Sequence, residues 1–269
     1  MNKIGFLGSG NMAEALIKGL INSGLFKPEN ILIADIRPER LESLSSQYGV
    51  TQAKNNADLA KKAGTIVLAV KPQKMTDALE SIKAQIREGQ LIISIAAGIK
   101  ISKIERTLGD VPIIRVMPNT PALVGEGASA LFANKKATFL LDMAKSIFQS
   151  VGIAVTVDCE DLIDTVTAVS GSGPAYFFLL MEKMIKAAVE LGLPGDIATT
   201  LVLKTARGAA ILAENAAKND ETCEQLRIKV TSPGGTTEAA LETFDQGSFD
   251  KLAVSAVKAA YKRSKELSE

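Results

Sequence analysis

Two glycine-containing segments of this 269-residue chain have the composition of anion-binding turns. In the first, Gly8, Gly10 and Ala13 are spaced as G-x-G-x-x-A between an apolar strand at 3–7 and an amphipathic helix. The first glycine of such a turn permits a tight bend, the second lets a pyrophosphate approach, and the small third residue permits close helix packing. The phosphate then faces free N–H groups at the positive end of the helix dipole. We therefore predict a dinucleotide site here, although ordinary turns between a strand and a helix also show this spacing.

The second segment, Ser232-Pro233-Gly234-Gly235-Thr236-Thr237, ends one predicted helix and begins another. It places the amides of Gly235, Thr236 and Thr237 at a helix N-terminus with hydroxyl groups around them, which is typical of a carboxylate or phosphate site. The same residues also make an adequate connector between two helices, with Thr236 as the N-cap.

The composition of the chain excludes several classes of function. The chain has no histidine, which argues against serine-hydrolase triads, zinc hydrolysis and histidine-assisted 2-hydroxy acid dehydrogenases. A net charge of +1 gives no basis for binding nucleic acid, and glycine and proline interrupt the longest uncharged run near the middle, 165–181, so we expect no membrane span. We expect no signal peptide and no metal site, and two cysteines without metal-type spacing favour the reducing cytoplasm.

Short apolar strands alternate with helical segments over residues 1–159. This alternation predicts a doubly wound, Rossmann-like α/β domain with a parallel sheet, which binds its ligand at the carboxyl ends of the strands. The predicted strand ends are rich in small or loop-forming residues, and they are 8–12, Asp35, 69–72, 96–98 and 117–119.

Residues after the second strand bear on the choice of cofactor. Asp35 stands near the position where an acidic side chain binds the ribose hydroxyls of NAD. Arg37 and Arg40 instead suit the 2′-phosphate of NADP, so the sequence leaves NADPH and NADH open. Asp35 would also serve to cap the helix that begins near Pro38.

Residues 160–269 contain helical patterns and need no strand, so we predict a second, all-α domain. Its long helices carry more apolar side chains than so short a segment can bury, which predicts association of subunits through this domain. A helical core within one chain is the alternative, and sedimentation as a monomer at micromolar concentration would favour it.

Six ordered motifs, spread over essentially the whole chain, resemble those of pyrroline-5-carboxylate reductase, the enzyme of the last step of proline biosynthesis. The motifs are 5–13, 69–72, 94–98, 117–122, 170–176 and 232–237. The resemblance implies reduction of 1-pyrroline-5-carboxylate to L-proline by hydride transfer from NADPH or NADH. It also implies a homodimer with an interleaved helical dimerisation domain, often assembled into larger rings. Substrate would lie between the cofactor of one subunit and helical loops partly from the other.

The resemblance also implies roles for individual residues. The substrate carboxylate, part of a cyclic imine, would be bound by Ser232, Gly234, Gly235 and Thr236, and Thr237 would act in catalysis through a hydrogen bond to the ring nitrogen. The cofactor would be bound by Gly8, Ser9, Gly10, Asn11 and Met12 at the pyrophosphate, by Asp35, Arg37 and Asn56 at the adenosine ribose, and by Ala69, Val70, Lys71, Pro72 and Ala97 near the nicotinamide.

The chain departs from the family just before the second turn, where Thr222-Cys223 replaces a frequent His-Pro pair. This puts in doubt a secondary contact from the segment 220–223.

Two other interpretations of the function stay open. One is a β-hydroxyacid dehydrogenase, although 170–181 lacks the lysine that such enzymes use, and the other is a nucleotide-sensing module without catalysis.

Overall fold

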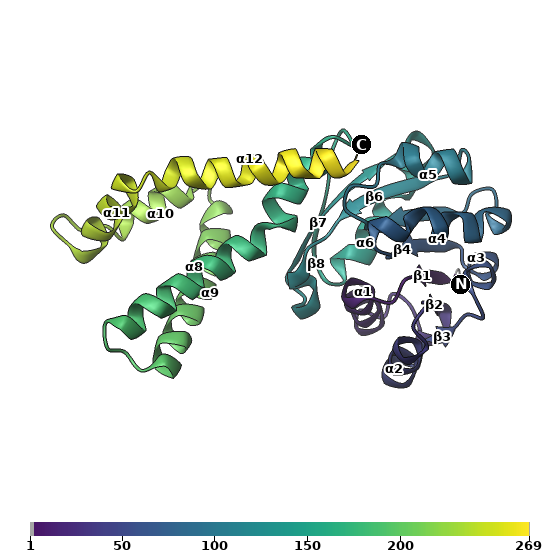
Figure 1. Ribbon diagram of the computed structural model, residues 1–269, viewed down its shortest axis with the longest axis horizontal. Helices are drawn as coiled ribbons and strands as arrows, with labels where there is room; N and C mark the ends of the chain where they lie inside the picture. The colour runs from purple at the N-terminus through teal and green to yellow at the C-terminus, as the bar shows by residue number, and fades with distance from the viewer. Residues whose placement is uncertain (1–2, 269) are drawn as a thin grey trace. The chain divides into compact units, whose positions relative to one another are not determined.

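The computed structural model describes residues 3–268, which form two compact units. The first unit runs to Pro174 and is completed by the chain from Ala259 on, whereas the second is Ala175–Lys258 (Figure 1). Two helices, α8 (Gly173–Glu190) and α12 (Phe249–Ser268), contribute residues to both units. The domain boundary predicted at residue 160 stays a prediction.

An eight-stranded sheet forms the centre of the first unit, in the order β3-β2-β1-β4-β5-β6-β7-β8. The strands from β1 to β6 are parallel, but β7 pairs antiparallel with β6 and parallel with β8. The predicted parallel sheet is confirmed from β3 to β6. Strand β7 reverses because only a short connection with a 3₁₀ turn at Thr120–Val124 separates β6 from β7, and a parallel pair needs a longer crossover. The strands are β1 Ile4–Leu7, β2 Ile31–Ala34, β3 Thr51–Gln52, β4 Thr65–Leu68, β5 Leu91–Ser94, β6 Ile113–Met117, β7 Gly127–Ala133 and β8 Gly152–Thr156.

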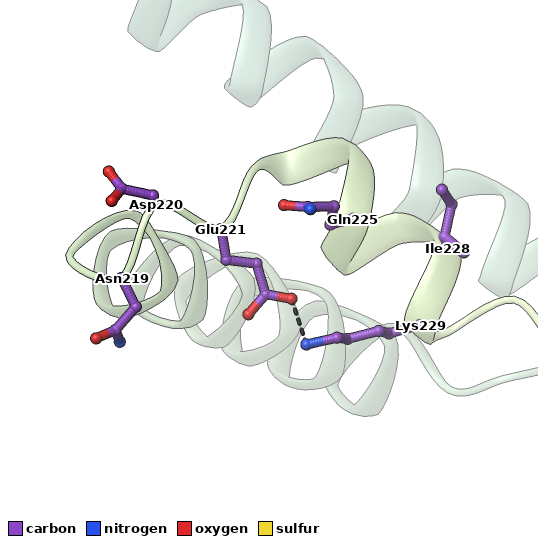
Figure 2. Close-up of a pocket in the computed structure, with 6 residues that line it drawn as sticks. All are labelled: Asn219, Asp220, Glu221, Gln225, Ile228 and Lys229. Carbon is purple, nitrogen blue, oxygen red and sulfur yellow. Dashed lines mark ion pairs between the residues drawn. The ribbon is translucent and has the colours of Figure 1, made fainter.

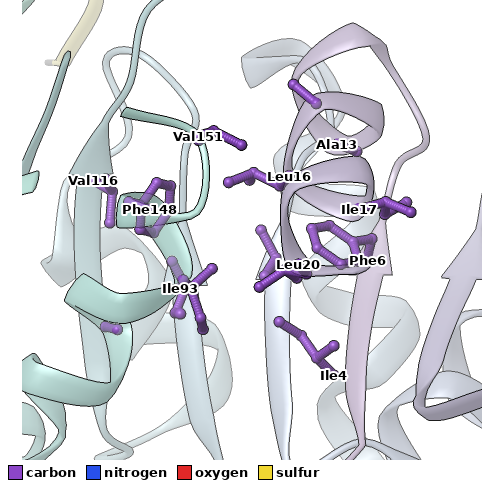
Figure 3. Packing of buried hydrophobic residues seen from close by; sticks show 14 of the residues in the cluster. Ile4, Phe6, Ala13, Leu16, Ile17, Leu20, Ile93, Val116, Phe148 and Val151 are labelled. Carbon is purple, nitrogen blue, oxygen red and sulfur yellow. The ribbon is translucent and has the colours of Figure 1, made fainter. Parts of the chain in front are cut away.

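Helices cover both faces of this sheet, and alternate residues of β1 serve the two faces. Phe6 packs in one cluster with Leu16, Leu20 and Phe148 (Figure 3), whereas Leu7 belongs to the cluster on the opposite face. This alternation follows from the two-residue period of a strand, and burial on both faces explains the continuous apolar composition of the strands. The helices of the first cluster are α1 Asn11–Asn22, α2 Pro38–Tyr48 and α6 Leu141–Gln149, and those of the second are α3 Asn56–Lys62, α4 Met75–Ile82 and α5 Ile101–Leu108.

The chain from residue 160 to 268 is helical, as predicted. Within residues 175–258, all of which the structure describes, the buried apolar side chains are Ala198, Val202 and Ala216. Large apolar side chains on the same helices are instead exposed, among them Phe177 and Phe178. Over the part of the chain that is described, no helix has the length and apolar content to cross a membrane. The remaining helices are α7 Leu162–Val166, α9 Gly195–Ala217, α10 Cys223–Lys229 and α11 Thr236–Gln246, with a π-helical turn at Thr167–Gly171.

A buried ionic cluster ties several elements of the first unit together. Arg115 on β6 is almost fully buried, and its guanidinium donates to Glu160 at 3.1 Å and to Asp164 at 3.3 Å. Asp164 also accepts hydrogen bonds from Ser264 at 2.8 Å and from Ser268 at 3.3 Å. Strand β6, helix α7 and the last turns of α12 are thus joined through one carboxylate.

Candidate functional site

The predicted cofactor residues follow strands that are neighbours in the sheet. Strands β2, β1, β4, β5 and β6 are adjacent in this order, so the segments after them lie along one edge. The chain passes from β1 to β2 on one side and returns to β4 on the other. Ligands of open α/β sheets bind in the crevice at such a reversal of strand order.

The turn between β1 and α1 has the backbone that the glycine spacing predicts. Gly8 has φ +92°, and a Cβ there would lie 2.6 Å from the carbonyl oxygen of Ala69. Gly10 is the N-cap of α1 and has no atom near the position of a Cβ, so its surroundings are open. The amides of Asn11 and Met12 have no acceptor among the described residues. This turn therefore has the space and the free donors that a pyrophosphate requires.

Ser9 is fixed in this turn by its backbone. Its N–H donates to Asp35 Oδ2 at 2.7 Å, and its carbonyl oxygen accepts from Arg40 Nε at 2.7 Å. Its side chain is fully buried, yet its Oγ has no partner within residues 3–268. A buried hydroxyl without a partner is costly, so Ser9 Oγ is an unsatisfied polar atom at the glycine turn.

The carboxylate of Asp35 is saturated by protein donors. Oδ2 accepts from Ser9 N and Arg37 Nη2, and Oδ1 accepts from Arg37 N and Arg37 Nε, at 2.7 to 3.0 Å. A carboxylate offers about four lone-pair sites, so all are in use. Burial opposes the charged form of Asp35, but the hydrogen bonds from Arg37 and Ser9 outweigh it and lower the pKa of the carboxyl group. Asp35 thus holds the glycine turn and Arg37 in place.

The two arginines of this region differ in their availability to a ligand. Arg40 is bound to Ser9 and forms an ion pair with Glu14, which also accepts a hydrogen bond from the Tyr48 hydroxyl at 2.9 Å. Its side chain is 21% exposed, whereas that of Arg37 is 51% exposed. Although burial opposes ionisation of Glu14, hydrogen bonds from Arg40 and Tyr48 lower its pKa. Of the two guanidinium groups, that of Arg37 is therefore the more accessible, and its contact with a cofactor phosphate stays a prediction.

The other predicted cofactor residues lie in the segments that follow β3, β4 and β5. Ala69, after β4, donates from its amide to Leu7 O at 2.7 Å, which places this segment beside the glycine turn. Lys71 is the N-cap of a 3₁₀ turn at Pro72–Lys74. Ala97 follows β5, and Asn56, the first residue of α3, donates to Ser81 Oγ at 2.9 Å. None of these contacts identifies a ligand, so the roles of these residues stay predictions.

The second predicted turn lies in the second unit, between α10 and α11. Gly234 has φ +69°, and the amide of Gly235 donates to Ser232 O at 2.9 Å, which closes a β-turn. Proline at the second position and a glycine with positive φ at the third are typical of a type II turn. The amides of Thr236 and Thr237, at the start of α11, have no acceptor among the described residues. The turn therefore presents two free amides to an anion at the positive end of a helix.

The segment before this turn lines a pocket of about 410 Å³ at the start of α10 (Figure 2). Glu221 forms an ion pair with Lys229 across this pocket. Thr222 is the N-cap of α10, because its hydroxyl accepts from Gln225 N, and the Gln225 side chain accepts from Thr222 N in return. The side chains of Glu221 and Thr222 are thus engaged within the second unit.

Sequence reasoning gave no role to three polar side chains that the structure engages. Asn119 follows β6, donates to Ser170 O at 3.1 Å and accepts from Ala128 N at 2.8 Å, so it holds the π-helical turn at the ligand edge of the sheet. Glu238 accepts from Gly234 N at 2.7 Å. The only signal for Glu238 is its place as third residue of a helix, where an acidic side chain reaches back. For Arg115, the sequence signal is that it is the one charged residue in an otherwise apolar strand, which indicates that its side chain is buried.

Two family models match parts of the chain. Residues 160–267 match a model described as pyrroline-5-carboxylate reductase dimerisation. Residues 3–98 match a model described as NADP oxidoreductase, coenzyme F420-dependent. The two matches confirm the predicted fold class, a Rossmann-like domain followed by a helical domain.

Full-length relatives share the name pyrroline-5-carboxylate reductase. The protein of that name from Pseudomonas aeruginosa is 42% identical, over 99% of this chain and 97% of its own, and that from Synechocystis is 41% identical, over 98% of each. The solved structure of a pyrroline-5-carboxylate reductase from Coxiella burnetii has a TM-score of 0.91 and 39% identity, covering 100% of this chain and 99% of its own. The Plasmodium falciparum pyrroline carboxylate reductase, solved with NADP bound, has a TM-score of 0.89 and 35% identity, covering 100% of this chain and 98% of its own. The resemblance in the six motifs is thus confirmed over the whole chain, and the protein belongs to the pyrroline-5-carboxylate reductase family.

Proposed function

We propose that this chain reduces 1-pyrroline-5-carboxylate to L-proline, with NADPH or NADH bound at the glycine turn and the substrate carboxylate bound at the Ser232–Thr237 turn. The observation that carries the proposal is the second turn, which offers two free amides and three hydroxyl side chains at one helix N-terminus. That chemistry suits the carboxylate of a small cyclic imine. Family membership over the full length supports the same reaction.

The reaction requires positioning more than acid–base catalysis. Bound NAD(P)H supplies a hydride. A cyclic imine that arrives protonated is already an electrophile, and its reduction gives a neutral amine without a proton from the enzyme, in agreement with a chain that has no histidine. The hydroxyls of Ser232 and Thr236 and the free amides of Thr236 and Thr237 hold the carboxylate, and the Thr237 hydroxyl bonds to the ring nitrogen; Gly235 shapes the turn through its hydrogen bond to Ser232 O. The rate enhancement then comes from orientation of the reacting atoms.

For the cofactor, we propose a preference for NADPH. Asp35 has no acceptor position left for the ribose hydroxyls, because Ser9 and Arg37 occupy all of them. The half-exposed guanidinium of Arg37 suits a 2′-phosphate. Both points favour the phosphorylated cofactor over NADH.

For the assembly, we propose a homodimer formed through the helices of the second unit, with a larger ring of dimers as the further possibility from the family resemblance. The exposed apolar side chains of α8, α9 and α12 support association.

We propose the cytoplasm as the compartment, since both cysteines, Cys159 and Cys223, are exposed free thiols.

Steady-state kinetics of the purified chain with racemic pyrroline-5-carboxylate, using NADPH and NADH side by side, test the proposal. We expect turnover with both cofactors and a larger kcat/KM with NADPH.

We expect Thr237→Ala to lower kcat/KM for the imine by roughly one to three orders of magnitude, as for the loss of a hydrogen bond to a charged group. Thr243→Ala, on an exposed part of the same helix, is the matched control. Cofactor binding without any imine-dependent oxidation would contradict the reaction, and an unchanged rate for Thr237→Ala would remove Thr237 from the mechanism.

A further inference from the structure

The four amides of residues 234–237 in the Ser232–Thr237 turn fall into two groups. The N–H of Gly235 closes the turn on Ser232 O, and the N–H of Gly234 donates to the Glu238 carboxylate at 2.7 Å. The amides of Thr236 and Thr237 have no acceptor within residues 3–268. The protein thus uses two amides to shape the turn and leaves two others for a ligand.

Glu238 supplies a hydrogen-bond acceptor for an amide that the turn itself leaves without one. In a type II turn the single internal hydrogen bond joins the first and fourth residues, so the N–H of the third residue, here Gly234, is left over. Glu238 belongs to the first turn of α11, and its carboxylate reaches back to this N–H. Turn and helix are thereby fastened to each other, which fixes Ser232 relative to the free amides of the helix N-terminus.

The type of side chain at position 238 has two opposing effects on an anion site. A carboxylate accepts a stronger hydrogen bond than a neutral group and is favoured near a helix N-terminus, so it holds the turn well. Its negative charge also repels a second carboxylate bound at the same helix end. If the hydrogen bond is the function of Glu238, a neutral acceptor of the same length should serve as well.

We propose that Glu238 is a positioning residue for the substrate carboxylate, acting through the amide of Gly234. This inference rests on the proposed function, because it assumes that the Ser232–Thr237 turn binds the substrate. Glu238 orders the site without touching the substrate, so its loss weakens substrate binding and leaves hydride transfer and cofactor binding intact.

The test compares kcat, the KM for pyrroline-5-carboxylate and the KM for NADPH in four variants of the full chain. Glu238→Ala removes the acceptor and should raise the KM for the imine about three- to tenfold, the range for one lost hydrogen bond, with kcat and the KM for NADPH within about twofold of the original chain. Glu238→Gln retains an acceptor oxygen without charge and should keep the KM for the imine at or below the original value. Glu242→Ala, which removes an exposed carboxylate one helical turn later, is the control and should change nothing. Should Glu238→Ala fail to fold, Glu238→Asp, whose carboxylate is one methylene shorter, takes its place.

The fourth variant, Ser232→Ala, separates this inference from the proposed function. If the original chain shows no oxidation of NADPH that depends on pyrroline-5-carboxylate, the proposed function fails. If the chain is active but neither Ser232→Ala nor Glu238→Ala raises the KM for the imine, the reaction stands and the role of Glu238 is overturned. If Ser232→Ala raises that KM and Glu238→Ala does not, only the role of Glu238 is overturned. A KM for Glu238→Gln as high as that of Glu238→Ala, or an equal loss in kcat and NADPH binding, would also overturn it.

Discussion

At the scale of single residues, Asp35 and Arg37 form an ion pair in which the two side chains differ in accessibility. All acceptor positions of Asp35 are occupied, whereas the side chain of Arg37 is half exposed. The position of Asp35 after β2 suggests a ribose ligand, but its four hydrogen bonds assign it to the glycine turn and to Arg37. The pKa of Asp35 is lowered and that of Arg37 is raised, with their mutual hydrogen bonds as a main cause in both. Both side chains are therefore charged over the range in which cofactor binds.

We expect Arg37→Ala to shift the chain from NADPH towards NADH. The substitution removes the cation proposed to bind the 2′-phosphate. It also frees the two acceptor positions of Asp35 that accept from Arg37 Nε and Nη2, whereas the backbone amide of residue 37 still donates to Asp35. The KM for NADPH should rise about tenfold or more, as for a lost charge-assisted hydrogen bond, while the KM for NADH stays constant or falls. Arg106→Ala, which removes an exposed arginine from α5, controls for the change in overall charge. An equal rise in KM for both cofactors would contradict this role.

At the scale of elements, the ionic cluster around Arg115 decides how the end of the chain is held. The carboxylate of Asp164 is nearly fully buried and receives Arg115, Ser264 and Ser268. Glu160 supplies the second partner of Arg115 and also accepts from the amide of Ile101 at 2.8 Å, at the start of α5. Four elements thus depend on two carboxylates that pair with one buried cation through Nη1 and Nη2, and this cation would be costly to leave unpaired.

Asp164→Ala should lower the free energy of unfolding by about 3 kcal/mol, the lower end of the range for removing one partner of a buried ion pair, because Glu160 still pairs with Arg115. Urea denaturation monitored by circular dichroism measures the change. Asp161→Ala, which removes an exposed carboxylate three residues earlier, should alter stability by less than about 0.5 kcal/mol. A similar small effect for Asp164→Ala would show that the cluster does not stabilise the fold.

At the scale of the whole molecule, the second unit lacks a core of its own. Its buried apolar side chains are two alanines and one valine, whereas phenylalanines and leucines of α8 and α9 are exposed. An apolar surface of this kind is favourable only when another surface covers it. This observation supports the proposed homodimer more directly than the hydrophobic pattern of the sequence does.

Phe178→Glu should weaken the dimer. Phe178 is 62% exposed in the single chain, so a charge there does not disturb an internal contact but is costly in an apolar interface. We expect sedimentation equilibrium at micromolar concentration to give a dimer for the original chain and a monomer fraction for the variant. Lys183→Gln, on the same helix, changes the net charge by the same amount and should stay dimeric. A monomeric original chain would contradict the proposed association.

The sequence by itself determined the elements of this protein and the kind of chemistry it performs. The period of the apolar residues specified buried strands and amphipathic helices, because burial on one or both faces requires these patterns. The glycine and proline positions of the two turns were equally readable, since positive φ values and close approach restrict residue choice locally. The six motifs sufficed for the family.

Only the tertiary structure decided which polar groups are in use and which are free. Asp35 and Arg40 suit cofactor contacts by their positions in the sequence, yet the structure engages both. Arg40 is bound to Ser9 and Glu14, which are distant along the chain, and Asp35 accepts from Ser9 and from its neighbour Arg37. The ion pairs of Arg115 likewise depend on partners that no local pattern specifies. Spacing along a chain fixes backbone conformation over a few residues, whereas the satisfaction of a buried donor or acceptor is settled only when separate elements meet.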